Sequence, residues 1–219
     1  DLPLQSRLQR AMSLVHDHLH ALDDALAWAV RAAESARTAG DDGLLADALL
    51  SGGVARSKAG DTEGGLENYR EVLRLHEAGG RIGASISVPN NIGINLKNLG
   101  RLDESVAALR RVLELMDGRP EAASRPLVQT NLAEPLWRLG RLDEAQAAID
   151  AALTDLDLRP SNPHEANARW LRAQVLRARG RPAEAHGELQ RALDVARHLG
   201  RMDTEANVQH ALSELAAER

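Results

Sequence analysis

The chain has 219 residues, of which 43% are hydrophobic and 27% are charged, a balance that excludes wholesale disorder. It contains no cysteine, which excludes disulfides, thiolate nucleophiles and zinc sites with cysteine ligands. The net charge of −5 argues against bulk nucleic-acid binding, and no apolar run is long enough to cross a bilayer. Aromatic residues make up only 2%, and strand-favouring residues are scarce beside Ala, Leu, Arg and Glu, so the composition predicts an all-α protein.

Helix-breaking residues alternate along the chain with a period of 40 residues. One set consists of Gly60, Gly100, Gly140 and Gly180, with His20 at the same phase. Half a period away stand Gly40, Gly80, Pro120, Pro160 and Gly200. Each interval holds about 20 residues, enough for a helix of about four turns. The pattern therefore predicts repeated pairs of helices.

Small side chains recur at two fixed positions of this unit. Seven residues before the first breaker stand Ser13, Gly53, Gly93, Ala133 and Ala173. Five residues after it stand Ala25, Gly65, Ser105, Ala145 and Ala185. Small residues at both positions let the two helices of a pair approach closely. Acidic residues such as Asp103 and Glu104 suit the positive end of the second helix.

The spacing of Gly93, Gly100 and Ser105 resembles the tetratricopeptide repeat, which places a small residue, a turn glycine and a second small residue at these intervals. The 40-residue unit is similar to the longer repeats of kinesin light chains, LGN-type scaffolds and bacterial transcriptional or signalling regulators. "PNNIG" at 89–93 and "QTNLA" at 129–133 look like the motif "LNNLA" of those proteins. The resemblance implies a right-handed superhelical solenoid of five helix pairs with a C-terminal capping helix.

We expect one solenoid domain over 1–219, with units near 1–40, 41–80, 81–120, 121–160 and 161–200. Inner helices are expected near 4–18, 44–58, 84–98, 125–139 and 166–179, and outer helices near 22–38, 61–77, 102–117, 142–157 and 182–198. A last helix near 202–217 would cap the stack. Because the sequence begins in mid-pattern without methionine, we expect it to be a fragment of a longer protein.

The sequence carries no motif of an enzyme: there is no phosphate-binding loop, dinucleotide fingerprint, nucleophile elbow or His-Glu-x-x-His. It therefore predicts no enzymatic activity, no catalytic residue and no cofactor. The cluster of His16, His18 and His20 is the one arrangement that resembles a metal site, with Asp24 one turn further on. Nothing elsewhere completes a ligand shell, so we predict no metal site and leave the role of the cluster open.

The inner segments carry a net positive charge and the outer segments a net negative one. The resemblance implies that inner helices line a concave groove, so we expect a basic groove that binds a peptide. The expected peptide-binding residues are Asn90, Ile94, Lys97, Thr130, Glu134, Trp137, Arg169, Trp170, Gln174 and Arg177. Amides would bond the peptide backbone, cations would meet carboxylates and tryptophans would hold an apolar anchor. The alternative for the tryptophans is a place in the core, and we expect Asn91 and Asn131 to support helix packing.

The sequence therefore predicts a cytoplasmic protein- or peptide-binding module, the partner-sensing region of a bacterial transcriptional or signalling regulator that takes an acidic segment. Two other classes stay open: a scaffold that self-assembles into homo-oligomers, and an accessory or sensor domain for an anionic small molecule. Membrane and nucleic-acid partners are not expected.

Overall fold

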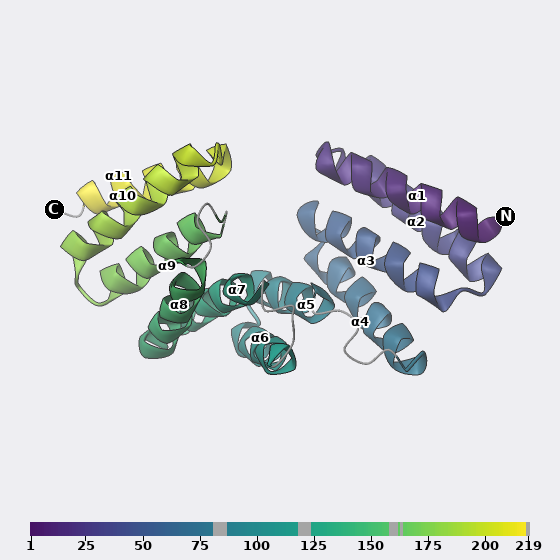
Figure 1. Cartoon of the computed structure of the whole chain (residues 1–219), viewed down its shortest axis with the longest axis horizontal. Coiled ribbons are helices and arrows are strands. Elements are labelled where there is room, and N and C mark those ends of the chain that lie inside the picture. The colour runs from purple at the N-terminus through teal and green to yellow at the C-terminus, as the bar shows by residue number, and fades with distance from the viewer. Residues whose placement is uncertain (81–86, 118–123, 158–161, 163, 218–219) are drawn as a thin grey trace. The chain divides into compact units, whose positions relative to one another are not determined.

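A computed structural model describes residues 1–80, 87–117, 124–157, 162 and 164–217 of the chain. These residues form eleven helices and no strand (Figure 1). The helices are α1 (Leu2–His18), α2 (Leu22–Ala39), α3 (Asp42–Lys58), α4 (Thr62–Ala78), α5 (Ser87–Asn98), α6 (Leu102–Met116), α7 (Arg125–Arg138), α8 (Leu142–Asp157), α9 (Glu165–Ala178), α10 (Pro182–His198) and α11 (Met202–Ala217). The all-α prediction is confirmed. The helix ends lie within two residues of those expected, apart from the expected start of α5 at 84, which lies outside the described residues.

The chain divides into two compact units, residues 1–108 and 109–219. In the first unit each helix from α1 to α5 packs against the next, and α3 also contacts α1 and α5. In the second unit each helix from α7 to α11 packs against the next, and α9 also contacts α7 and α11. Odd-numbered helices are therefore the inner members of stacked pairs, as the repeat predicts. Our expectation of one domain over 1–219 stays a prediction.

A left-handed residue ends the first helix of each described pair. The turn glycines Gly60, Gly100, Gly140 and Gly180 have φ between +69° and +91°, a conformation that glycine adopts without steric cost. His20 occupies the same phase with φ +58°, and within the described residues no other non-glycine residue has a positive φ. The repeat geometry thus imposes this turn even where glycine is missing.

The small residues allow the close helix contact that we predicted. A Cβ atom added to Gly53 would lie 2.6 Å from a ring carbon of Tyr69, so the ring of α4 packs directly on the backbone of α3. In the next pair the Ser105 hydroxyl donates to the Gly93 carbonyl over 2.7 Å. Ala145 is fully buried. A larger side chain at these positions would force the two helices of a pair apart.

The capping helix predicted from the sequence covers the end of the last pair. Val208, Ala211 and Leu215 of α11 are buried. They belong to a hydrophobic cluster with Ala173, Leu176, Ala185, Leu189, Ala192 and Leu193 of α9 and α10. Among the described helices, none has the combination of length and apolarity that a membrane span requires.

Candidate functional site

The inner helices of the second unit enclose a pocket of about 610 Å³, which we call the C-terminal pocket. Its wall comes from α7, α9 and α11, three helices brought together because α9 contacts both of the others. The lining residues are Trp137, His164, Asn167, Trp170, Gln174, Arg201, Thr204, Asn207, Val208, His210, Ala211 and Glu214. The volume lies within the range of about 300–1,000 Å³ that is typical of ligand-binding pockets.

Two tryptophans from neighbouring inner helices form the apolar part of the pocket. The Trp137 and Trp170 rings meet edge to face, with centroids 6.2 Å apart and an interplanar angle of 80°. Both rings stay partly accessible, while Val208, which also lines the pocket, is buried. Edge-to-face geometry fixes both rings and leaves apolar surface for a guest side chain.

Amide side chains supply hydrogen-bonding groups around these rings. Asn167 of α9 and Asn207 of α11 are exposed at the pocket, and Gln174 lies deeper in the wall. A primary amide both donates and accepts, which suits the alternating N–H and C=O groups of a peptide backbone. The pocket therefore combines an apolar platform with backbone-compatible polar groups.

The negative charge in the pocket is compensated within the protein. Arg177 donates to a Glu214 carboxylate oxygen over 3.0 Å, and His210 Nε2 lies 3.4 Å from the other oxygen. The hydrogen bond from Arg177 holds the pKa of Glu214 below its ordinary value, and the nearby His210 acts in the same direction. Glu214 is therefore ionised at neutral pH and contacts Arg177 and His210 at the rim.

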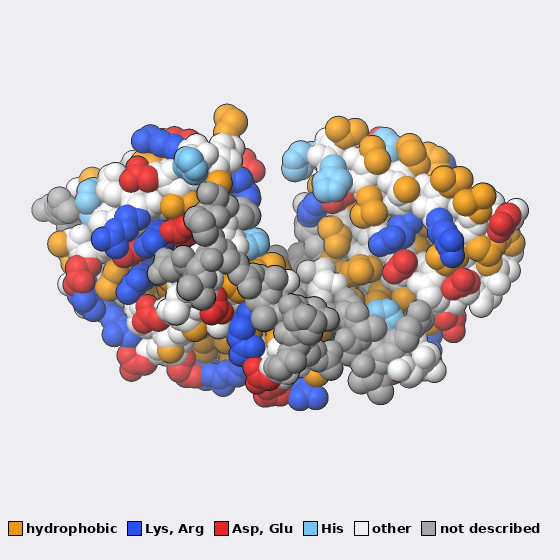
Figure 2. Space-filling model, viewed as in Figure 1, with side chains coloured by type: hydrophobic (Ala, Val, Ile, Leu, Met, Phe, Trp, Pro, Cys, Tyr) orange, Lys and Arg blue, Asp and Glu red, His pale blue; other side chains and the backbone are white. Residues whose placement is uncertain are grey.

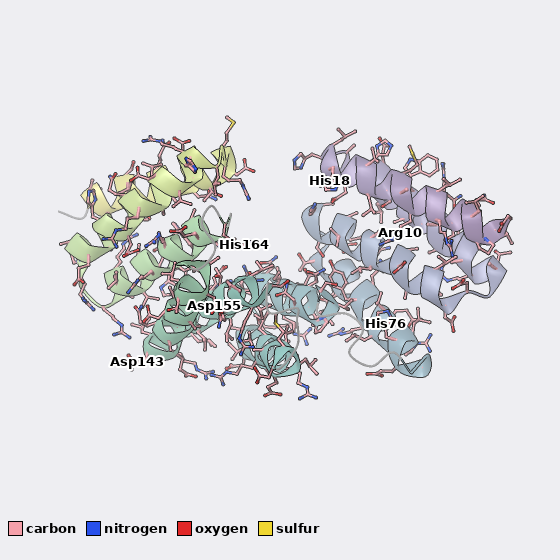
Figure 3. The ribbon with its side chains drawn as sticks, in the orientation of Figure 1. Arg10, His18, His76, Asp143, Asp155 and His164 are labelled. Carbon is pink, nitrogen blue, oxygen red and sulfur yellow. The ribbon has the colours of Figure 1, made fainter. Side chains whose placement is uncertain are left out.

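The positive charge of Arg201, at another part of the lining, has no carboxylate partner among the described residues. The Arg201 side chain is exposed and makes no hydrogen bond or ion pair with any other described residue. His164, at the start of α9, is half-buried (Figure 3). Burial lowers the pKa of His164, and the positive charge of Arg201 lowers it further. Within the described part of the chain, the pocket thus presents a guanidinium without a carboxylate partner beside an imidazole whose pKa is lowered.

Several residues expected to bind peptide meet in this pocket. Trp137, Trp170 and Gln174 line it, and Arg177 bonds its rim residue Glu214. Sequence reasoning missed the contribution of α11, including Arg201 and Asn207, because we treated that helix only as a cap. The polar residues on the face of α11 that does not pack against α10 could have indicated that this helix contributes to a site.

Thr130 and Arg169 differ from the expectation and are corrected here. Thr130 is 1% exposed, and its hydroxyl donates to the Pro126 carbonyl within α7. Arg169 pairs with Glu188 of the outer helix α10 at 3.2 Å and with Glu165 of its own helix α9 at 2.8 Å. Burial alone would lower the pKa of Arg169, but the two carboxylates raise it above the ordinary value. Neither side chain is available to a ligand.

The remaining expected residues do not line the C-terminal pocket. Glu134 is half-buried on α7. Ile94 and Lys97 are partly exposed on α5, in the first unit, and Asn90 is buried there, so the expectation that Asn90 faces a ligand is also corrected. Asn91, which we expected to support packing, interacts with the Tyr69 hydroxyl of α4 and also lines a second hollow.

This second hollow, the N-terminal pocket, lies between the inner helices α1, α3 and α5 and has a volume of about 220 Å³. Its apolar part consists of Leu14, Leu50 and Val54. Asn91 and Ser87 of α5 lie at its edge. The same face of the inner helices is therefore hollowed in both units.

The described residues include no group of three or more His, Asp or Glu side chains arranged to hold a metal ion. His16 Nδ1 lies 3.6 Å from Asp24, while His18 and His20 are exposed. The arrangement offers a single histidine–aspartate contact and no closed ligand shell.

The stacked helix pairs and the hollowed inner face define a helical-repeat protein, and comparison with known proteins names the repeat. Family models of the tetratricopeptide repeat match residues 90–116 and 124–198. The chain is a tetratricopeptide-repeat protein, as its turn glycines and small residues indicated. The comparison with curated proteins found no match.

Solved structures share this fold at low sequence identity. The nearly identical TPR-like repeats of a kinesin light chain from Podosopora anserina match with a TM-score of 0.74 and 17% identity, over 92% of this chain and 99% of that one. The Rap conjugation gene regulator of plasmid pLS20, in complex with the Phr* peptide, matches with a TM-score of 0.78 and 18% identity, over 95% of this chain and 58% of that one. YrrB, described as a TPR protein with an unusual peptide-binding site, matches with a TM-score of 0.56 and 18% identity, over 85% of this chain and 84% of that one.

Proposed function

We propose that the chain binds a protein or peptide segment, with the C-terminal pocket as the anchor site. The observation that carries this proposal is the edge-to-face pair of Trp137 and Trp170 in a pocket that also presents amide groups. Partly exposed tryptophans in a concave site are typical of binding hot spots. The Rap regulator and YrrB, whose descriptions name a peptide or a peptide-binding site, support the same class of partner.

We further propose that the bound segment carries an acidic residue next to its apolar anchor. Arg177 and Arg169 are engaged with carboxylates of the protein itself, so the cation that meets the ligand is Arg201. A guanidinium binds a carboxylate through two parallel hydrogen bonds, which gives direction as well as attraction. The biological setting that we propose is the cytoplasmic partner-sensing region of a bacterial transcriptional or signalling regulator.

The test is selection of peptides from a random display library, followed by calorimetric titration of the enriched sequences. Trp137→Ala and Trp170→Ala should each abolish or strongly weaken binding, because they remove the anchor surface. Trp28→Ala is the matched control, since Trp28 lies on α2 in the other unit and stacks on Arg31. Enriched peptides that bind both pocket variants as tightly as the parent protein would contradict the proposal.

The acidic preference is tested separately by repeating the selection with Arg201→Glu. Peptides enriched on the parent protein should carry Asp or Glu, and peptides enriched on Arg201→Glu should show no preference for these residues. Arg7→Glu is the control, because it makes the same change of net charge on an exposed residue of α1. Equal enrichment of acidic residues on the parent and on Arg201→Glu would show that Arg201 does not bind the acidic residue of the ligand.

An anionic small molecule is a second candidate ligand. The volume of about 610 Å³ and the unpaired Arg201 favour it, because both suit a compact ligand. Thermal-shift screening with nucleotides and carboxylate metabolites distinguishes the two classes. A metabolite that raises the melting temperature and displaces the selected peptides would favour a role as a small-molecule sensor over peptide binding.

A further inference from the structure

The exposed face of α1 is the most apolar surface in the described part of the chain. Of the ten large apolar side chains that are most exposed there, seven belong to α1 and its C-cap: Leu2, Leu4, Leu8, Met12, Leu14, Val15 and Leu19. Figure 2 shows these apolar side chains gathered over α1. Soluble proteins seldom leave such a contiguous patch without a binding role.

Five of these residues form one continuous stripe. Leu4, Leu8, Met12, Val15 and Leu19 follow one another at intervals of four, four, three and four residues. Such spacing keeps them on a single face through four helical turns. The buried face of α1, marked by Ser6 and Ser13, lies on the other side of the helix. Leu8 is 59% exposed and Leu19 is 69% exposed.

The next repeat buries the corresponding face. Forty residues after Leu8 and Met12 stand Ala48 and Gly52 of α3, and both are buried. A Cβ atom added to Gly52 would lie 3.4 Å from the Cβ of Ala29, on the preceding outer helix. The stripe on α1 is therefore an interface face that nothing covers within the described residues.

Two positions beside the stripe differ between α1 and α3. Leu45 and Leu49 of α3 are buried in a cluster with Ala32, Ala33 and Ala36 of the outer helix α2. The corresponding residues of α1 are Gln5 and Gln9, and Gln9 accepts a hydrogen bond from Ser35. The same cluster contains Tyr69, Val72 and Leu75 of α4, and Leu75 stands forty residues after Ser35. Gln9 therefore lies on the side of α1 that contacts its own outer helix α2, beside the stripe.

The stripe is complementary to itself in the antiparallel sense. Reversal about the midpoint between Ala11 and Met12 exchanges Leu4 with Leu19 and Leu8 with Val15. At the centre, the long Met12 would face the small Ala11 of the other copy, which leaves room for the methionine side chain. The helix dipoles of antiparallel helices also oppose each other favourably.

The rest of the described surface offers no comparable match. Met202 is the single large exposed apolar residue of α11 among the described residues, so a head-to-tail contact between α1 and α11 would bury little apolar area. The stripe itself carries no acidic residue, and Asp17 is turned to Lys58 of α3. Two copies of the stripe can therefore meet without opposing carboxylates.

We propose that two copies of this chain associate through α1, packed antiparallel about a two-fold axis near Ala11 and Met12. Such an interface is isologous, so each residue pair occurs twice. The 17 residues of α1 span about 25 Å, and one helix pair buries less than the roughly 1,200–2,000 Å² of a standard interface. The association is therefore concentration-dependent and in rapid exchange.

Sedimentation of the purified chain over a wide range of concentration tests the proposal. We expect the weight-average mass to rise from monomer to dimer, and Leu8→Glu to abolish the rise. Val30→Glu is the matched control, because Val30 is 45% exposed on α2 and lies outside the stripe. A monomer at all concentrations, or a dimer that Leu8→Glu leaves intact, would overturn the proposal. Circular dichroism verifies that both variants keep their helices.

The orientation of the two helices is tested by cross-linking. Because the chain contains no cysteine, one introduced thiol is unique. With a short bismaleimide, Met12→Cys should cross-link to its own copy near the two-fold axis. Leu19→Cys should not, since the two thiols would lie about 22 Å apart along the helices. A mixture of Leu4→Cys and Leu19→Cys should give a mixed dimer. Self cross-linking of Leu19→Cys would instead indicate parallel helices and overturn the antiparallel arrangement.

Discussion

Arg177 and Glu214 join the last inner helix to the capping helix, with 3.0 Å between a guanidinium nitrogen and a carboxylate oxygen. This pair lies at the rim of the C-terminal pocket and connects α9 to α11. It explains why the arginine expected to meet a ligand is already neutralised by the protein. It also makes the contact between these helices sensitive to acid.

The first prediction concerns this acid sensitivity. The pKa of Glu214 is lowered in the folded protein, so its contribution to stability is complete above the ordinary glutamate pKa and is lost as the pH falls through the lowered value. Melting curves of the parent and of Glu214→Gln should differ slightly at neutral pH and converge in acid. A difference that grows as the pH falls would contradict this assignment. The effect is small because both side chains are solvent-accessible.

A second prediction concerns the left-handed turn at His20. A residue with a Cβ atom is strained at φ +58°, and glycine relieves this strain although it adds entropy to the unfolded chain. His20→Gly should stabilise the protein by about 0.5–1 kcal/mol, measured as a higher denaturant midpoint with an unchanged slope. Gly100→His makes the opposite change at the same phase of another repeat and should destabilise it. Loss of stability in His20→Gly would show that the imidazole makes a needed contact.

A third prediction tests the close approach of paired helices. Ala145 is fully buried in α8, so Ala145→Leu should overpack the pair and cost about 1–3 kcal/mol. Ala147→Leu is the control, because Ala147 is exposed two residues further along the same helix and should change stability by less than about 0.5 kcal/mol. Chemical denaturation of both variants measures the difference. Equal midpoints for the two variants would exclude the close contact at Ala145.

A fourth prediction concerns removal of α11. Truncation after Gly200 uncovers the apolar cluster that contains Leu189 and Leu193, so the protein should melt earlier and aggregate. A milder variant, Leu215→Ala, keeps the helix and should cost about 2–5 kcal/mol because Leu215 is fully buried. An unchanged melting temperature in both variants would mean that α11 adds nothing to the stability of the second unit.

The fold was predictable because the repeat encodes it many times. The same residue types recur at fixed spacing, as Gly100 and Gly140 do at the turns and Gly93 and Ala133 do within the inner helices. Each unit therefore predicts the same helix pair independently. His20 stands where the other units have glycine, and it still adopts the left-handed backbone conformation of the turn. Repetition of this kind makes the assignment of helices robust against local exceptions.

The candidate site was less predictable because side-chain direction depends on neighbouring helices. Thr130 occupies a position that faces a ligand in the resembled repeats, and Arg169 was expected from the charge pattern to meet an acidic segment. The Thr130 hydroxyl instead bonds within its own helix, and Arg169 pairs with Glu188 on α10. Trp137 and Trp170 both line the C-terminal pocket, and their edge-to-face contact follows from the packing of α7 on α9. Arg201 was missed because no repeat unit contains α11.

Because α11 covers the apolar end of the last repeat and also supplies half of the pocket wall, the pocket exists only while this helix is docked. A ligand that touches both α9 and α11 must hold the helix in place, and its binding energy adds to the stability of the docked state. Hydrogen exchange along residues 202–217 should therefore slow when the pocket is filled. Under the proposed function, filling the pocket should therefore increase the order of the C-terminal helix.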